Sequence, residues 1–169
     1  MIEFITSKVV GAIAAMVLLG SILGFFAIQR SSAEEQQFRD MCDSLARTID
    51  GVSSLNAGTA VNVTFGQNNS GLRLDFSFRN KGYDIEIHVG QVIFRQGGLT
   101  AVRALTRHIH PWDPKLASNG TTIYASEETL LRLDSENLVL KAPSGKDLVV
   151  ESRSLAISGD IRYGTFVHF

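Results

Sequence analysis

The chain has 169 residues, which is enough for one ordinary domain and an appendage but too few for two full domains. Charged residues make up 20% of it, the formal net charge is −1, and the Lys and Arg residues are scattered, so no basic patch predicts nucleic-acid binding. The mean hydropathy of +0.10 is high for a soluble domain. The excess comes from Val9 to Ile28, twenty consecutive residues without a charge.

This apolar segment predicts a membrane-type helix. Twenty residues at about 1.5 Å each span about 30 Å, the thickness of the hydrocarbon core of a bilayer. A cleaved signal peptide is the alternative, and Ser31-Ser32-Ala33 resembles a weak cleavage site. However, residues 1–7 carry Glu3 and no basic residue, and the first Lys is Lys8. The uncleaved helix is therefore the better interpretation.

The helix is expected to continue beyond the apolar segment, because neither Gly nor Pro occurs from Gln29 to Asp50. Apolar residues there recur at spacings of three and four, which is typical of a helix with one apolar face. They are Phe38, Met41, Cys42, Leu45, Ala46, Ile49 and Val52. One helix from about Phe4 to about Asp50 is predicted, within an N-terminal segment of residues 1–54.

From residue 55 to 169 the pattern changes to the alternation of polar and apolar residues that is typical of β-strands. An antiparallel meander is expected first, with joints rich in Asn, Gly and Ser. Its strands are Thr59–Phe65, Leu72–Phe78, Tyr83–Val89 and Gln91–Arg95. Leu99–Ile109 is ambiguous, and the Pro111-Trp112-Asp113-Pro114 stretch predicts an irregular loop.

Further strands are predicted at Thr121–Ala125, Thr129–Leu133, Asn137–Lys141, Asp147–Glu151 and Ile161–Phe169. Eight or nine short strands favour a sandwich or a partly closed barrel. The expected fold class is therefore α+β, a long N-terminal helix followed by an antiparallel, sandwich-like β-rich domain.

Small residues on the predicted helix stand at the spacing of helix interfaces. Gly20 and Gly24 are one turn apart, and Gly11 and Ala15 are likewise. Such positions let two backbones approach closely in apolar surroundings, although a solitary anchor can also contain Gly and Ala. Glu3 either lies among lipid headgroups or meets the free amine of a neighbouring chain.

Three Asn-x-Ser/Thr sequons, at Asn62, Asn68 and Asn119, are candidate N-glycosylation sites. Together they favour an exported domain. A strand surface rich in Ser and Thr is the competing explanation.

The rest of the sequence offers few candidate catalytic or metal-binding residues. His108 and His110 would share one face of a strand near Asp113, but two His without an assured third ligand predict no metal site. The single cysteine, Cys42, cannot form an intrachain disulfide and reads as a small apolar residue on the helix. No nucleophile elbow, phosphate loop or dinucleotide motif occurs, so neither an enzyme nor a cofactor is expected.

This layout resembles the type IV pilin superfamily, in particular the archaeal pilin-like proteins. The resemblance covers the architecture of the whole chain. It is carried by the apolar helix Val9 to Ile28, its amphipathic continuation through residues 43–50 and the change to strands at about Thr59. In that superfamily the long helix packs into a filament core, and the β-domain faces solvent. The resemblance makes Glu3 the acidic candidate for a helix-pairing contact.

The function implied is that of a structural subunit of an extracellular, type IV pilus-like surface filament. The subunit would self-associate through its N-terminal helices and be anchored in the membrane before assembly. A second layout is similar, that of the accessory proteins of the archaellum, where one membrane helix anchors a β-sandwich that binds an envelope component. Continuous helicity across Gln29 to Asp50 favours the pilin, because an anchored accessory domain more often has a flexible tether.

Overall fold

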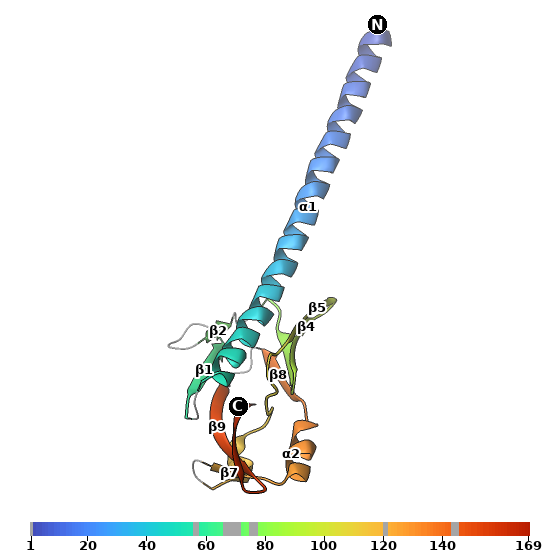
Figure 1. Ribbon diagram of the computed structural model, residues 1–169. Helices are drawn as coiled ribbons and strands as arrows, with labels where there is room; N and C mark the ends of the chain where they lie inside the picture. The colour runs from blue at the N-terminus through green and yellow to red at the C-terminus, as the bar shows by residue number, and fades with distance from the viewer. Residues whose placement is uncertain (1, 56–57, 66–71, 75–77, 120–121, 143–145) are drawn as a thin grey trace. The chain divides into compact units, whose positions relative to one another are not determined.

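The computed structural model describes residues 2–55, 58–65, 72–74, 78–119, 122–142 and 146–169, and leaves the side chains of residues 2–8, 72–73 and 116–119 undescribed. It contains a long N-terminal helix followed by sheets of mixed strands (Figure 1), so the predicted α+β class is confirmed. The chain divides into two compact units, Met1–Gln37 and Phe38–Phe169. The sequence-based division at residue 54 follows the end of the helix, whereas the boundary of the units lies within it.

Helix α1, Ile2–Ser53, is longer at both ends than the predicted helix. In the first unit every side chain from Val9 to Ala33 is exposed, including the large apolar ones. Two of its polar side chains bond within the helix itself. The hydroxyl of Ser21 donates to the carbonyl of Val17 at 2.8 Å, and Arg30 pairs with Glu34 at 2.9 Å.

The second unit contains two sheets, both visible in Figure 1. The larger has the order β2-β1-β9-β7-β6, with β10 also paired to β9. Its strands are β1 (Ala60–Phe65), β2 (Leu72–Leu74), β6 (Ser118–Asn119), β7 (Thr122–Tyr124), β9 (Leu148–Ile157) and β10 (Asp160–His168). The smaller has the order β5-β4-β3-β8, from β3 (Tyr83–His88), β4 (Gln91–Gln96), β5 (Leu99–Ala104) and β8 (Leu138–Ala142). Two short helices complete the unit, η1 (Pro114–Ala117) and α2 (Glu127–Asp134).

Two-residue turns connect the antiparallel pairs. His88 faces Gln91 across one turn, and Gln96 faces Leu99 across the Gly97-Gly98 turn, so β3, β4 and β5 form a meander. The predicted meander is confirmed for its last pair, β3 with β4, whereas β1 and β2 belong to the other sheet. The β9–β10 turn consists of Ser158 and Gly159, both with positive φ. Two successive positive φ angles are what a tight hairpin of the right twist requires.

Most strand pairs are antiparallel, as predicted, but two are not. Strand β1 pairs parallel with β2, and β7 pairs parallel with β9. The predicted strand Leu72–Phe78 is confirmed only for Leu72–Leu74, with Phe78 in an isolated bridge to Lys81. Residues 75–77 lie outside the described part of the chain.

The predicted strand Thr129–Leu133 is wrong, because this stretch belongs to α2. The Ser126 side chain accepts a hydrogen bond from the backbone N–H of Thr129 and caps the helix. Glu127 and Glu128 stand in the first turn, where the helix dipole favours negative charge. Leu130 and Leu133, three residues apart, form the buried face.

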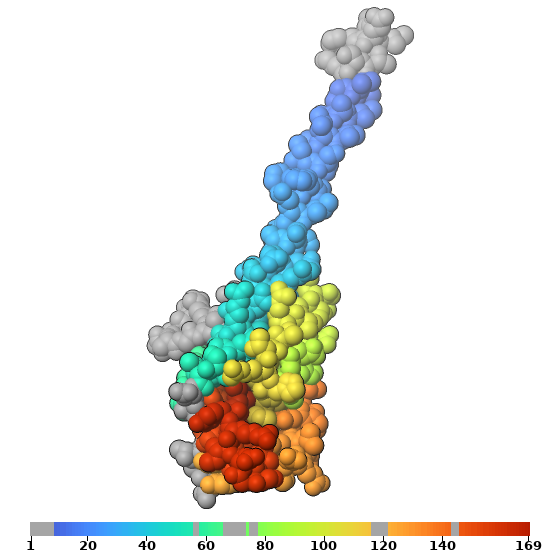
Figure 2. Space-filling view, in the orientation of Figure 1, coloured from blue at the N-terminus to red at the C-terminus, as the bar shows by residue number. Residues whose placement is uncertain are grey.

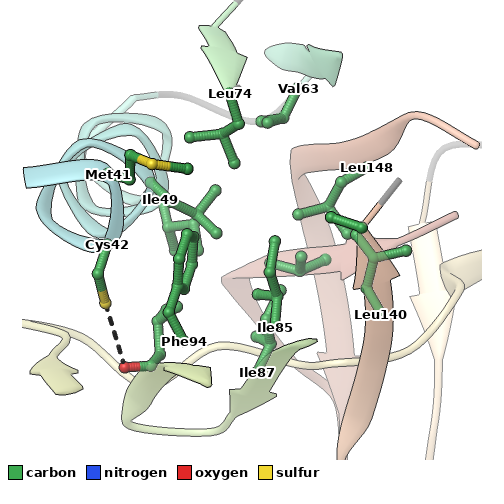
Figure 3. Close-up of a cluster of buried hydrophobic side chains, with 14 of the residues drawn as sticks. Met41, Cys42, Ile49, Val63, Leu74, Ile85, Ile87, Phe94, Leu140 and Leu148 are labelled. Carbon is green, nitrogen blue, oxygen red and sulfur yellow. Dashed lines mark hydrogen bonds between the residues drawn. The ribbon is translucent and has the colours of Figure 1, made fainter. Parts of the chain in front are cut away.

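The main core lies between the second half of α1 and the inner faces of both sheets. Figure 3 shows Met41 and Ile49 of α1 directed toward Phe94, Ile85 and Leu74. The predicted apolar stripe of the helix is confirmed, since each of its members is buried, from Phe38 at 1% to Met41 at 8% exposure. A helix of this length is therefore stabilised in its second half by tertiary packing as well as by its own hydrogen bonds.

A smaller core lies on the other face of the larger sheet. Ile123 and Leu155, neighbours in the β7–β9 pair, pack with Leu130 and Leu133 of α2. Trp112 and Phe166 complete this cluster, with ring centroids 5.0 Å apart. On the face visible in Figure 2, the end of α1, the residues after β5 and β10 lie side by side (teal, yellow and red).

We expect Ile49→Ala to lower the free energy of unfolding by about 2–5 kcal/mol, because it leaves a cavity at a fully buried position. Leu131→Ala is the matched control, since Leu131 is 73% exposed, and should change it by no more than about 0.5 kcal/mol. Urea unfolding of the detergent-solubilised chain, followed by the fluorescence of Trp112, measures both. Equal effects of the two substitutions would contradict the packing of α1 described above.

Candidate functional site

The exposed apolar part of α1 is the first candidate functional surface. Val9 to Ile28 contains large side chains with half or more of their surface exposed, such as Met16 at 70% and Ile28 at 71%. Among the described residues, α1 is the one helix long and apolar enough to cross a membrane, and no part of its apolar window is buried. Membrane anchors and signal sequences both have apolar helices of this kind, so the length and composition of α1 do not distinguish between them. A contiguous apolar surface of this size requires a lipid or protein environment.

The small residues predicted to pack against neighbouring helices are uncovered. A Cβ added at Gly11, Gly20 or Gly24 would meet no atom within 4 Å, and Ala15 is exposed. The structure therefore leaves these four positions accessible to another molecule. Glu3 lies in α1, but its side chain is outside the described part of the structure.

Three sets of hydrogen bonds, called the polar ties below, join the second half of α1 to β5 and the residues that follow it. Asp43 accepts hydrogen bonds from Nε and Nη2 of Arg103, the latter at 3.0 Å. Asp50 accepts from the backbone N–H and the hydroxyl of Thr106 at 2.9 and 2.8 Å.

The third tie lies at the end of the helix, where Nη1 of Arg107 donates to the carbonyl of Ser53 at 2.6 Å. A carbonyl in the last turn has no partner within the helix, so this cation satisfies it and suits the helix dipole. The ties fix which side of α1 faces the strands.

His110 belongs to a polar cluster beside the smaller core. Its Nδ1 donates to Asp134 at 2.8 Å, and Nε1 of Trp112 donates to the same carboxylate oxygen at 2.9 Å. The His110 ring stacks on Phe166 with centroids 4.9 Å apart. A Cβ on Gly164 would lie 3.0 Å from the ring, so a larger residue there would have to displace the ring by a few tenths of an ångström.

A second histidine cluster lies near the end of β10. Nε2 of the buried His168 donates to Glu151 at 2.8 Å, and Arg153 pairs with the other oxygen of Glu151 at 2.7 Å. Buried charged groups are stable when they are paired in this way. Both clusters hold the last strand against its neighbours, and neither was predicted from the sequence.

His108, His110 and Asp113, which lie close together in the sequence, are not brought together as ligands of one metal ion. His108 is exposed, Nδ1 of His110 is bound to Asp134, and Asp113 accepts from the backbone N–H of Lys115 at 2.8 Å. Within the described ranges, no group of three or more His, Cys, Asp or Glu side chains is placed to hold a metal ion.

Cys42 is a fully buried apolar residue, as predicted. Its thiol lies 3.7 Å from the backbone carbonyls of Val92 and Ala101. Burial raises the pKa of the Cys42 thiol to about 11, against smaller lowering effects of the Arg103 charge and a backbone hydrogen bond from Phe94.

The structure places one of the three candidate glycosylation sites on the surface. Asn62 is exposed in β1, opposite Val149 of β9. Asn119 ends the short strand β6, with its side chain undescribed, and Asn68 lies outside the described residues. Modification of these residues stays a prediction.

Comparison with models of protein families, with curated proteins and with solved structures finds no match to this chain. Its function must therefore be argued from its own surfaces.

We expect a fragment covering Ser31–Phe169 to be soluble and monomeric, because it keeps the whole core and omits the exposed apolar segment. The full chain should require detergent or self-assemble. Size-exclusion chromatography with light scattering distinguishes these states. A full chain that stays monomeric in plain buffer would contradict the expectation that lipid, detergent or another protein chain must cover the apolar segment.

The Cys42 thiol should be unreactive toward a thiol reagent at pH 8 in the folded protein, because it is buried and its pKa of about 11 keeps it protonated. Unfolding in guanidinium chloride should release full reactivity. Since the folded-state pKa is raised above 9.0, this group's contribution to stability is present below pH 9 and lost as the pH rises through 11. Rapid labelling of the native protein would contradict the burial.

Proposed function

We propose that the protein is a structural, pilin-like subunit of an extracellular surface filament of the type IV pilus kind. The apolar part of α1 packs among the same part of other copies and forms the filament core. The β-domain forms the coat, and a membrane holds the helix before assembly. The role is non-enzymatic and needs neither a cofactor nor nucleic acid.

The observation that supports this proposal best is the exposed apolar segment on an otherwise well-packed chain. The helix is buried by its own strands from Phe38 to Val52, whereas Val9 to Ile28 has no cover from its own chain. Burial of apolar surface contributes about 25 cal/mol per Å², so covering this segment provides a large driving force for insertion or association. A filament core supplies such a cover outside the membrane.

The placement of the small residues also supports association. Gly20 follows Gly11 by nine residues, which is about 2.5 helical turns, so the Gly11/Ala15 pair and the Gly20/Gly24 pair lie on opposite sides of α1. A helix with close-packing positions on two sides suits a bundle in which it has neighbours on both. A solitary anchor in lipid requires neither pair.

The alternative is a membrane-anchored β-sandwich accessory protein that binds an envelope component, as a stator of the archaellum does. The length of the apolar segment suits this role equally, since about twenty residues span a bilayer once. The two functions differ in whether helix packing between copies is required.

A double variant, Gly20→Leu with Gly24→Leu, tests this difference. It adds bulk where helices are proposed to approach most closely, and overpacking a fitted interface costs about 1–3 kcal/mol for each subunit. Leu is a better helix former than Gly and is compatible with lipid, so an anchor should tolerate the change. No atom of the chain itself lies within 4 Å of either added Cβ, so the fold should persist.

Filaments sheared from cells are counted by negative-stain microscopy, and membrane fractions are probed for the protein. Val10→Leu with Met16→Leu is the matched control, because it changes two exposed positions that are already large. Loss of filaments in the glycine variant alone, with normal membrane levels, supports the proposal. Filaments at normal abundance in that variant would disprove close packing at these glycines.

A further inference from the structure

A polar hollow of about 220 Å³ lies in the second unit, separate from the exposed helix. It is formed where the end of α1, the segment after β5 and the β9–β10 pair meet. Its lining includes Ser54, Arg107, His108, Ser152, Tyr163 and Thr165. Ser152 and Thr165 face each other across β9 and β10, so two hydroxyl side chains stand side by side on its wall.

The charged side chain in the lining of the hollow is the cation Arg107. Arg107 and His108 line it, and its described lining contains no carboxylate. Asp50, one turn before Ser54 in α1, already accepts two hydrogen bonds from Thr106. One nitrogen of Arg107 is held by the carbonyl of Ser53, which positions the guanidinium at the hollow. Its other N–H groups suit the planar, two-oxygen geometry of a carboxylate.

The rim of the hollow is aromatic and apolar. Tyr163 is 70% exposed, and Ile161, on the same face of β10, is 69% exposed. Tyr163 and Ile161 lie on one face of the β7–β9–β10 sheet, and the smaller core packs on the other face. Tyr124 lies on the same face as Tyr163. An exposed tyrosine offers a flat apolar ring with a polar end, a combination that suits ligands with both characters.

We propose that this hollow binds a saccharide unit that carries a carboxylate, of the uronic acid type. The carboxylate pairs with Arg107, with His108 beside it. The sugar hydroxyls bond to the exposed Ser54, and the C–H face of the ring lies on Tyr163. Ser152 and Thr165, which are 2% and 5% exposed, form the polar floor beneath the ligand. The hollow, of about 220 Å³, has room for one sugar ring and is too small for a protein segment.

The test uses the full-length chain in a polyoxyethylene detergent, because a detergent with a sugar headgroup would compete. Methyl glucuronide is titrated and its binding followed by saturation-transfer NMR and calorimetry. Methyl glucoside, which lacks the carboxylate, and acetate and phosphate, which lack the ring, are titrated in parallel. The glucoside lacks the hydrogen bonds to the charged Arg107, so we expect it to bind about tenfold more weakly than the glucuronide or worse. Acetate and phosphate keep the charge but lose the contacts of the sugar ring, so they should also bind more weakly than the glucuronide.

Three variants locate the binding. Arg107→Gln should weaken glucuronide binding about tenfold or more. Tyr163→Ser should weaken it about threefold to tenfold, and because Tyr163 is exposed this variant should fold even if loss of the Arg107 tie disturbs the end of α1. Tyr124→Ser is the matched control, since Tyr124 lies on the same sheet face, is 66% exposed and does not line the hollow.

Selective glucuronide binding that is weakened by Tyr163→Ser and unchanged by Tyr124→Ser supports the assignment. Equal binding of glucuronide and glucoside, equal binding of acetate, or no binding at about 20 mM ligand would overturn it. Because the hollow lies wholly within Phe38–Phe169, these results are independent of filament assembly. The glycine variants described above leave the hollow intact and can be titrated as well.

Discussion

The burial of one stripe of α1 against two sheets is the interaction on which the rest of the β-domain depends. Phe38, Leu45 and Ile49 are almost wholly inaccessible, and they touch strands that are distant from one another in the sequence. Without the helix the inner faces of both sheets would lose a shared partner. The second half of α1 is therefore a structural part of the β-domain and not only a connection to it.

The polar ties along α1 complement this packing with directional specificity. Apolar contacts favour burial but discriminate weakly between rotations of a helix about its axis. The Asp43–Arg103, Asp50–Thr106 and Ser53–Arg107 contacts are spread over about three turns of the helix, and each requires one particular orientation. The last of these also positions the cation of the polar hollow, so the same contact that ends the helix shapes a recognition surface.

The sequence predicted α1, the β3–β4 hairpin and the boundary between helix and strands because those features are encoded in local periodicity. It failed at Thr129–Leu133, where five residues alternate like a strand but the Ser126 cap and two glutamates stabilise a helix. It also missed the partners of His110 and His168, since Asp134 and Glu151 are brought to them by tertiary structure. The hollow was likewise unpredictable, because its walls come from segments up to a hundred residues apart.

The central position of β9 has a consequence for biosynthesis. Strand β9 pairs with β1, β7 and β10, so the first strand of the β-domain has its antiparallel partner only once residues 148–151 have been made. During translation the apolar helix therefore emerges long before its domain can close. Pairings of such long range form slowly. The order of the elements thus separates in time the synthesis of the apolar helix from the folding of the β-domain that follows it.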